Sequence, residues 1–291
     1  MSSLEYDRFG PWIYEVKTLD DMPKVFKPNY LKIKDALLCI KIPREIERRL
    51  ANPEMDLYDY ILAVFEDSLY IIKRVDQGVE EFVINLQSIT AIKDYQNLLH
   101  GQLTIYTSNQ VTSINYNTVS CEFIIQLLNL IRRRYSEKCV SIMSIQDHSE
   151  DISEESNYYY HYLLKRLKKI EQPFKMVGLL YSNKHEEWFT KVFHKIMSPF
   201  HLFKSIYLLG NMYLVNEREL LIATHEKGKK ANYSCCFTYI PIGCINDISS
   251  QVENNRTVIC IDIRGQALKY PTEGISSSVK ELIETIRNIC T

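Results

Sequence analysis

The sequence predicts a mainly β protein with some helix (α+β), built as two copies of one architecture. The first observation is an internal repeat, because residues 82–92 return at an offset of 156 as residues 238–248. The second is that each copy contains about seven short strand-like runs, and the third is an amphipathic helix that closes each copy. The matched apolar pairs are Ile84 and Ile240, Leu86 and Ile242, Ile89 and Ile245, and Ile92 and Ile248.

Length and charge limit the functional classes. A chain of 291 residues is long for one core and comfortable for two domains. A formal net charge of −1 leaves no global basic surface, so we expect no nucleic-acid partner. We find neither a signal-peptide pattern nor an apolar run long enough to span a bilayer, and the expected location is the cytoplasm.

The motifs of common enzyme and metal sites are missing from the sequence. The eight cysteines include no Cys-x-x-Cys pair, so we predict no disulfide framework and no zinc site. The nine glycines are not spaced for a phosphate-binding loop. His185 and His194 lie nine residues apart, off the spacing of a zinc helix. We therefore expect no catalysis, no metal, no cofactor and no small-molecule substrate.

The first copy is predicted over residues 35–137, after an N-terminal arm over residues 1–34. The arm contains three prolines and no sustained period. A short helix-like segment follows the first strand at residues 44–51, and the copy ends in a helix over residues 121–135 whose apolar residues share one face. The strand-like runs are residues 35–42, 57–66, 68–74, 81–86, 88–94, 102–107 and 111–117.

The second copy is predicted over residues 173–291, after a connection over residues 138–172. Residues 141–157 are acidic and rich in serine, which predicts a solvated linker, and residues 158–170 have helical spacing. The copy includes a helix-like insert at residues 185–197 and ends in a helix that begins at Ser278. Its strand-like runs are residues 176–181, 206–216, 220–225, 233–239, 242–248, 257–263 and 266–270.

Two segments, residues 85–92 (NLQSITAI) and residues 241–248 (PIGCINDI), share an apolar-x-x-Ile-x-x-Ile pattern. This pattern and the order of strands and helix resemble the pleckstrin-homology (PH) superfold, most closely its bacterial PH-like and GRAM-like branch. The resemblance covers about residues 35–135 and 176–290. It implies two tandem PH-like barrels, each of about seven strands and capped by its C-terminal helix.

The first basic cluster follows the first strand. It consists of Lys41, Arg44, Arg48 and Arg49, where some PH domains bind phosphoinositide headgroups. Those relatives add basic residues on the next strand, whereas residues 57–60 here are LYDY. Salt bridges on an exposed segment are the favoured interpretation, and an anion or lipid site is the alternative.

The second basic cluster lies on the polar face of the helix predicted over residues 158–170. It consists of Lys165, Arg166, Lys168 and Lys169, opposite a face of tyrosine and leucine. A basic amphipathic helix can lie on an anionic membrane. Docking of its apolar face on the protein is the favoured interpretation.

The sequence therefore predicts a non-catalytic, cytoplasmic binding or scaffolding protein with an unknown protein partner. Peripheral association with an anionic membrane or phosphoinositide-like headgroups, through the two basic clusters, is the alternative. The resemblance implies a peptide groove between the strand near Ile89 and the helix over residues 121–135. We expect the linker helix to cover the equivalent groove near Ile245.

Overall fold

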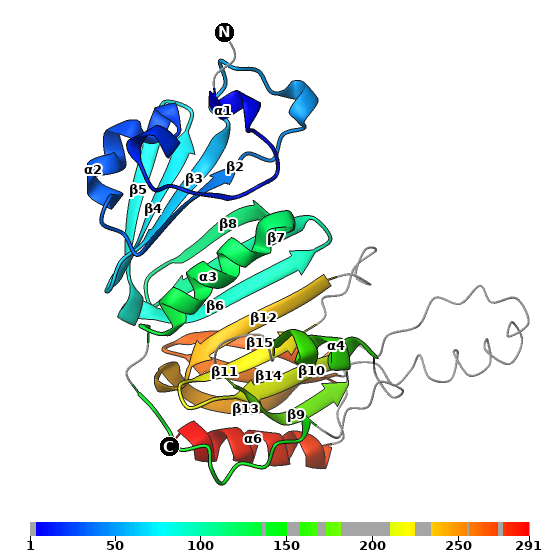
Figure 1. Ribbon diagram of the computed structural model, residues 1–291. Coiled ribbons are helices and arrows are strands. Elements are labelled where there is room, and N and C mark those ends of the chain that lie inside the picture. Colours follow the sequence, from blue (N-terminus) through cyan, green and yellow to red (C-terminus); the bar gives the residue numbers. More distant parts are fainter. Residues whose placement is uncertain are drawn as a thin grey trace, which may run out of the picture. The chain divides into compact units, whose positions relative to one another are not determined.

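The computed structural model describes residues 4–135, 138–149, 158–167, 173–181, 210–224, 234–254, 256–272 and 276–290 (Figure 1). Strands account for 46% of the described residues, so the protein is mainly β with a few helices, as predicted. Over these described ranges the sheets are antiparallel, and none is closed into a barrel. The chain divides into unit 1, residues 1–89 and 98–136, and unit 2, residues 90–97 and 137–291.

Unit 1 contains a five-stranded antiparallel sheet with its strands in chain order. These are β1 (Tyr14–Glu15), β2 (Leu38–Pro43), β3 (Tyr58–Val64), β4 (Ser68–Val75) and β5 (Gly78–Asn85). The unit also contains the hairpin of β7 (His100–Thr107) and β8 (Val111–Asn117) and the helix α3 (Cys121–Arg132). The buried residues of α3 include Ile124, Leu128 and Ile131, as the helical spacing predicts.

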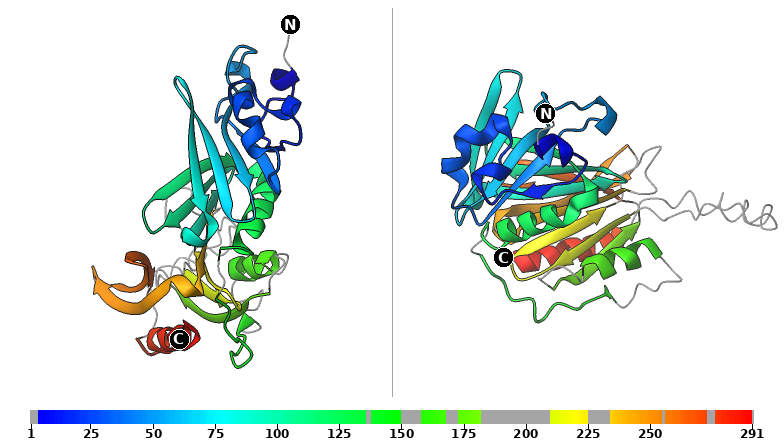
Figure 2. Two further views of the ribbon diagram at one scale, coloured as in Figure 1. Left: turned by 90° about the vertical axis from the view of Figure 1, so that its left-hand side faces the viewer. Right: turned by 45° about the horizontal axis from the view of Figure 1, so that its top comes forward.

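The N-terminal arm packs against one face of the five-stranded sheet (Figure 2). It forms α1 (Leu4–Asp7), the 3-10 helices η1 (Leu19–Asp21) and η2 (Lys24–Asn29), and α2 (Tyr30–Ile33). Phe26 of η2 is fully buried in one cluster with Ile61 of β3 and Ile72 of β4. Because these side chains share one core, the arm is part of the core of unit 1.

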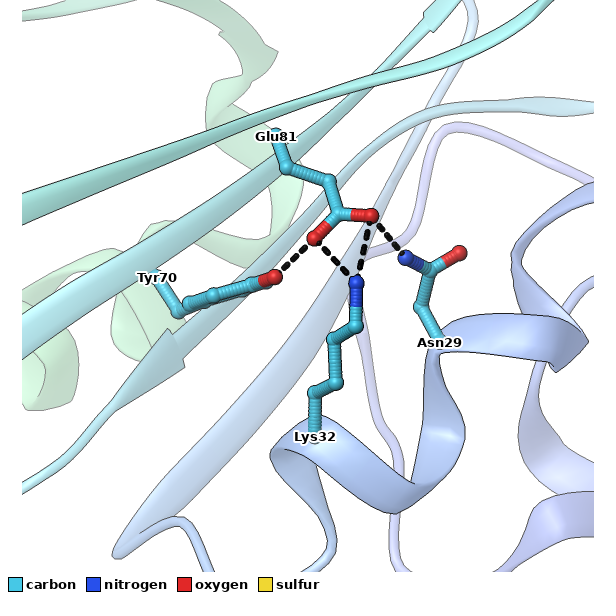
Figure 3. A network of polar contacts seen from close by, with 4 residues as sticks. All are labelled: Asn29, Lys32, Tyr70 and Glu81. Atoms are coloured by element: carbon cyan, nitrogen blue, oxygen red, sulfur yellow. Dashed lines mark hydrogen bonds and ion pairs between the residues drawn. The ribbon is translucent and has the colours of Figure 1, made fainter.

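A polar cluster around Glu81 of β5 joins the arm to the β4–β5 hairpin (Figure 3). The Oε1 atom of Glu81 accepts hydrogen bonds from Nδ2 of Asn29 at 2.6 Å and from Nζ of Lys32 at 2.8 Å. Its Oε2 atom lies 2.7 Å from Nζ of Lys32 and accepts a hydrogen bond from the hydroxyl of Tyr70. The hydrogen bonds from Lys32 and Tyr70 lower the pKa of Glu81, since they favour the carboxylate.

We expect Glu81→Gln to lower the thermal unfolding midpoint of unit 1 modestly at neutral pH and to have less effect in acid. A carboxyl group with a lowered pKa in the folded state stabilises the protein above its ordinary pKa of 4.5. That stabilisation is lost as the pH falls through the lowered value. Thermal unfolding from pH 7 downwards measures the difference. Glu80→Gln, on the exposed neighbouring residue, is the control, and an equal response of both variants would contradict the prediction.

Unit 2 contains a sheet in the order β6–β12–β11–β10–β9, with all described pairs antiparallel. The first strand of this order is β6 (Ile89–Asn97). Its residues 90–97 belong to unit 2, and residues 92–97 pair with β12. The other strands are β9 (Lys175–Tyr181), β10 (Gly210–Val215), β11 (Glu219–Thr224) and β12 (Ser234–Pro241).

Both faces of this sheet are covered, which explains why β10, β11 and β12 are buried at every position. Arg166 of α4 (Tyr158–Leu167) lies over Phe237, and the strand register places Met212 on the same face as Phe237. Asn211, the neighbour of Met212, points to the opposite face because side chains alternate along a strand. There its Nδ2 atom donates to the carbonyl of Pro271 in β15.

A second sheet of unit 2 lies on that opposite face, together with the closing helix. It consists of β13 (Ile245–Glu253), β14 (Arg256–Ile263) and β15 (Gln266–Thr272). Helix α6 (Ser276–Cys290) packs against β9 and β13 through a buried stripe that includes Val279, Leu282 and Ile286.

The internal repeat is visible in the element bounds. Strands β5, β6 and β7 reappear at an offset of 156 as β12, β13 and β14, each with the same length. The 3-10 turn η4 (Leu86–Ser88) likewise reappears as η9 (Ile242–Cys244). Of the eight repeated apolar residues, seven are buried and Ile245 is half-buried. The two copies therefore share local structure through this whole region.

Three segments differ from the sequence prediction in their secondary structure or in the unit to which they belong. Residues 44–51 form only the 3-10 turn η3 (Arg48–Leu50), since Leu50 is exposed and no buried face supports a longer helix. Residues 242–244 form a turn before β13, rather than the start of a strand. Residues 90–97 belong to unit 2 instead of the domain predicted over residues 35–137, because the β6 backbone pairs with β12. The helix-like insert at residues 185–197 lies outside the described residues.

Candidate functional site

A groove of about 960 Å³ in unit 2 is the candidate functional site. Its floor is residues 176–180 of β9, which is the last strand of its sheet among the described residues. Its two walls are α6 and the segment of residues 138–149, which we call the strap. A terminal strand between two walls is a place where another extended chain can pair with the sheet.

One stripe of α6 faces the groove, since its lining residues recur at spacings of three and four. Leu282 and Ile289 are buried, whereas Ser278, Glu281 and Asn288 are exposed. The wall thus has an apolar base and a polar rim. The stripe consists of Ser278, Glu281, Leu282, Thr285, Asn288 and Ile289.

Gly178 lets α6 approach β9 closely. A Cβ atom at this position would lie 3.0 Å from Cδ1 of Leu282, which is closer than ordinary side-chain packing allows. A glycine on the strand therefore sets the depth at which the helix sits and the width of the groove at this point.

The strap is fastened to unit 2 at both ends, whereas the sequence predicts a solvated linker from residue 141 onwards. At its start, the N–H of Val140 donates to the carbonyl of Glu217 at 2.8 Å. Farther on, Nζ of Lys175 donates to the carbonyls of Ile142 at 2.8 Å and Ile145 at 2.9 Å. A lysine on β9 thus holds the middle of the strap beside the strand. Its acidic and serine-rich composition gave no sign of this attachment.

The end of the strap occupies part of the free edge of β9. The N–H of Met176 donates to Oδ1 of Asp147 at 3.0 Å, and its carbonyl accepts from the N–H of His148 at 2.9 Å. Backbone groups alternate between the two edges of a strand, and a bulge at Val177 shifts this alternation by one residue. Leu179 is therefore the next residue that turns its backbone away from β10. Within the described chain, the strap's backbone contacts with this edge end at Met176.

The charged groups of the groove lie on its walls. Nζ of Lys138 donates to the carbonyl of Cys290 at 2.6 Å, where a cation complements the C-terminal end of α6. Burial raises the pKa of the Cys290 thiol to about 11, although Lys138 acts in the opposite direction, so this thiol is protonated at neutral pH. Glu281 adds a carboxylate to the lining, and His148 adds an imidazole. Hydroxyl, amide and backbone groups make up much of the remaining polar surface, which suits hydrogen bonding to a ligand.

The side chain of Lys41, in the first basic cluster, is directed towards the N-terminal arm. Its Nζ atom donates to the carbonyl of Asp21 at 2.5 Å and lies 4.8 Å from the ring centroid of Tyr58. Burial lowers the pKa of Lys41, and the nearby carboxylates of Glu5 and Asp21 oppose this shift. This lysine joins the arm to the sheet.

Arg44, in the same cluster, contacts the chain between β2 and β3. Its Nη1 atom donates to the carbonyl of Asp56 at 3.1 Å, and its Nε atom lies 3.8 Å from Oδ1 of Asp59. Nη2 of Arg74 lies 2.8 Å from the same carboxylate oxygen. Arg44 is thus half-buried in a local ion-pair group.

The last two arginines of the cluster also have partners. The guanidinium of Arg48 lies 4.0 Å from the ring centroid of Tyr6, a cation–π contact. Arg49 forms an ion pair with Glu47. The four cations of the first cluster therefore contact protein groups individually and do not converge on one pocket.

The second basic cluster is only partly described. Lys165 is exposed, and Lys168 and Lys169 lie outside the described residues. Nη2 of Arg166 donates to Oε1 of Gln96 at 2.8 Å, and Nη1 lies 3.5 Å from Sγ of Cys235. The apolar face of α4 is buried, so this helix docks on its sheet, which was the favoured interpretation. Its buried residues are Tyr160, Leu163, Leu164 and Leu167.

The two grooves expected from the sequence differ from the observed one. Strand β6, which begins at Ile89, uses its edge at residues 92–97 for pairing with β12, so a peptide cannot pair with the strand along those residues. Helix α4 covers the β6–β12 sheet and not the groove of α6. The observed groove lies on the β9 side of α6. It could not be predicted because the sequence does not show that the strap lies beside β9. The only sequence signal for this groove was the stripe of polar residues along α6, from Ser278 to Asn288.

The chain matches no known protein-family model and none of the curated proteins with which it was compared. All eight cysteines are free thiols. Across the described ranges, no cluster of three or more His, Cys, Asp or Glu side chains is arranged to hold a metal ion. Among the described helices, none combines the length and the apolar character needed to cross a bilayer.

Proposed function

We propose that the protein is a non-catalytic binding protein that holds an extended peptide segment of a protein partner in the groove of unit 2. The observation that carries this proposal is that β9, the last strand of its sheet among the described residues, lines the groove, and its register directs the backbone of Leu179 away from β10. An added strand gains main-chain hydrogen bonds there without any special side chain. We place the protein in the cytoplasm, where its free cysteines are compatible with a reducing environment.

The two copies are, in this proposal, PH-like domains. The order of seven strands and a closing helix in each copy supports this assignment, as does the 3-10 turn at the same point of both repeats. The closing helix α6 packs against both sheets of its copy, through β9 and β13. Fold alone is a weak argument for function, so the proposed activity depends on the groove.

A peptide fits the groove better than a small polar substrate does. The floor offers backbone groups and the aliphatic side chains of Val177 and Leu180, whereas the rim offers hydroxyl and amide groups. A strand in this position would alternate its side chains between the rim of α6 and solvent. The groove thus supplies both the pairing edge and the mixed surface that an extended chain requires.

Association with an anionic membrane is less well supported. Lys41 and Arg44 are held by groups of unit 1, and the apolar face of α4 is buried in unit 2. A membrane-surface helix needs its apolar face free for the lipid. The protein-binding hypothesis requires none of these groups.

We expect Thr285→Arg to weaken peptide binding about tenfold or more, which corresponds to about 1.4 kcal/mol. Thr285 is half-buried and faces the groove, so a longer charged side chain would occupy the space of the ligand while its head reached solvent. Random phage-displayed peptides selected on the full chain provide the probe, and the affinities of the enriched peptides for each variant provide the measurement.

Glu284→Arg is the matched control, since it adds the same side chain at the neighbouring exposed position outside the groove lining. Enriched peptides should bind this variant as they bind the original protein. Peptides that bind both variants equally well, or a selection that enriches none, would contradict the proposed function.

A further inference from the structure

Two strands that pair across the repeat have counterparts elsewhere in the chain. Residues 92–97 of β6, in the first copy, pair with residues 234–239 of β12, in the second copy. At the offset of 156, β6 corresponds to β13 and β5 corresponds to β12. Within the described residues, β5 and β13 are each the last strand of a sheet. The chain thus carries a second example of each strand that forms the β6–β12 junction, each with one free edge.

Side-chain exposure separates the paired strands from these counterparts. Strand β12 is buried at every position, whereas Ile84 is the only buried residue of β5. Most of β6 is buried, whereas Ile248 is the only buried residue of β13. Val83 of β5 is 60% exposed, and Val252 of β13 is 76% exposed. Exposed edge strands of this kind are templates for pairing with another chain.

The free edge of β5 presents its backbone groups at alternate residues. A two-residue turn joins β4 to β5, with Val75 opposite Gly78, so Gly78 bonds back to β4. Backbone groups alternate between the two edges along an antiparallel strand. Val79, Glu81 and Val83 therefore direct their N–H and C=O groups away from β4.

The free edge of β13 follows the same rule. Glu253 lies opposite Arg256 at the hairpin end of β13 and β14, so Glu253 bonds back to β14. Ile248, Ser250 and Val252 therefore direct their backbone groups away from β14. Each free edge thus offers three residues for pairing, at positions that the offset of 156 relates to those of the β6–β12 junction.

We propose that β13 of one molecule pairs, antiparallel, with β5 of a second copy of this chain. The register is that of the β6–β12 junction, in which Gln96 lies opposite Cys235. The corresponding residues are Val252 and Val79, so an exposed valine meets a half-buried one. Three hydrogen-bonded pairs, each exchanging two bonds, give about six main-chain hydrogen bonds between the molecules.

The charges of the two strands are compatible in this register. Glu80 lies opposite Gln251 and Glu81 lies opposite Ser250, so no like charges meet. Two β5 strands centred on each other would instead bring these acidic residues together, and like charges directly opposite are destabilising. The pairing of unlike strands is therefore favoured over the pairing of two β5 strands.

Each molecule offers one strand of each type, so the contact is heterologous. Such contacts give closed rings where the rotation between neighbours closes and filaments where it does not. The groove beside β9 takes no part in this contact. The inference is thus independent of the proposed function, and either can fail without the other.

The first test divides a cysteine pair between two molecules. Val79→Cys and Val252→Cys variants are mixed and oxidised with copper phenanthroline. In the proposed register their Cα atoms lie about 5.5 Å apart, within the range of a disulfide. We expect a covalent dimer of the two variants, with the bond assigned to positions 79 and 252 by mass spectrometry of peptides.

Gln251→Cys in place of Val252→Cys is the matched control. Side chains alternate along a strand, so this cysteine lies on the opposite face of β13 and should give no dimer above the level of the original protein. Equal cross-linking from positions 251 and 252, or no 79–252 bond, would overturn the proposal. A double variant, Val79→Cys/Val252→Cys, that forms the bond only within one molecule would also overturn it.

The second test changes one charge at the free edge of β13. Gln251→Lys places a cation opposite Glu80, whereas Gln251→Glu places a like charge there. By sedimentation velocity over a range of concentrations, we expect the lysine variant to self-associate about threefold or more tightly than the glutamate variant. Added salt should reduce the difference.

Asn246→Lys and Asn246→Glu make the same charge changes at an exposed residue of β13 outside the paired positions. These two control variants should associate equally. A chain that is monomeric at every concentration, or equal association of the two Gln251 variants, would overturn the proposal. A charge effect of the same size at Asn246 would also contradict it, since the response would then not depend on the register.

Discussion

The Phe26→Ala variant is expected to lose about 3–5 kcal/mol of the free energy of unfolding of unit 1. Phe26 lies on the N-terminal arm and is fully buried against residues of β3 and β4. Removing its ring leaves a cavity between the arm and the sheet, and the cost combines lost apolar burial with lost packing. Chemical denaturation measures the loss, with the unfolding of unit 1 monitored by hydrogen exchange of its backbone amides.

Leu31→Ala is the control on the same arm. Leu31 is 76% exposed, so its truncation should change stability by no more than about 0.5 kcal/mol. Similar small effects of both substitutions would show that the arm is not part of the core. Unit 1 would then be stable without residues 1–34.

The Leu282→Ala variant is expected to lower the stability of unit 2 by about 2–5 kcal/mol. Leu282 is buried between α6 and β9, where its Cδ1 atom lies over Gly178. The same measurement applies, with hydrogen exchange followed in β9 and α6. Glu284→Ala, at an exposed position of the same helix, should change stability by about 0.5 kcal/mol or less.

A double-mutant cycle tests the close approach at Gly178 directly. Gly178→Ala adds a methyl group 3.0 Å from Cδ1 of Leu282 in the original protein, so the leucine must move. In the Leu282→Ala background the methyl group enters vacated space, and its cost should be smaller. Strictly additive effects would contradict this packing, since residues in contact are expected to couple.

The periodicity of the sequence was sufficient to predict most of the regular structure. Short runs of apolar residues located the strands, and the repeat at an offset of 156 anticipated matching elements in both copies. The helical spacing of α3 and α6 predicted their buried stripes for the same reason. These features depend on the spacing of apolar residues a few positions apart, and this spacing can be read directly from the sequence.

The candidate site was much less predictable. The basic clusters drew attention because charge is conspicuous in a sequence, yet Lys41 and Arg166 have partners from distant parts of the chain, at Asp21 and Gln96. The groove depends on the strap beside β9, which is held by Nζ of Lys175 and by the backbone of Met176. Each of these contacts has a backbone group on at least one side, and backbone groups leave no residue signature, so the composition of the strap suggested only a linker.

The sequence by itself determined the elements, their order in two copies, and the apolar residues that form the cores. The tertiary structure alone decided that residues 92–97 pair with β12, that the strap borders the groove, and that Leu98 adopts a left-handed conformation. Strands have two edges that are chemically alike, because every residue carries the same N–H and C=O groups. Which chain takes each edge therefore depends on how the whole molecule packs.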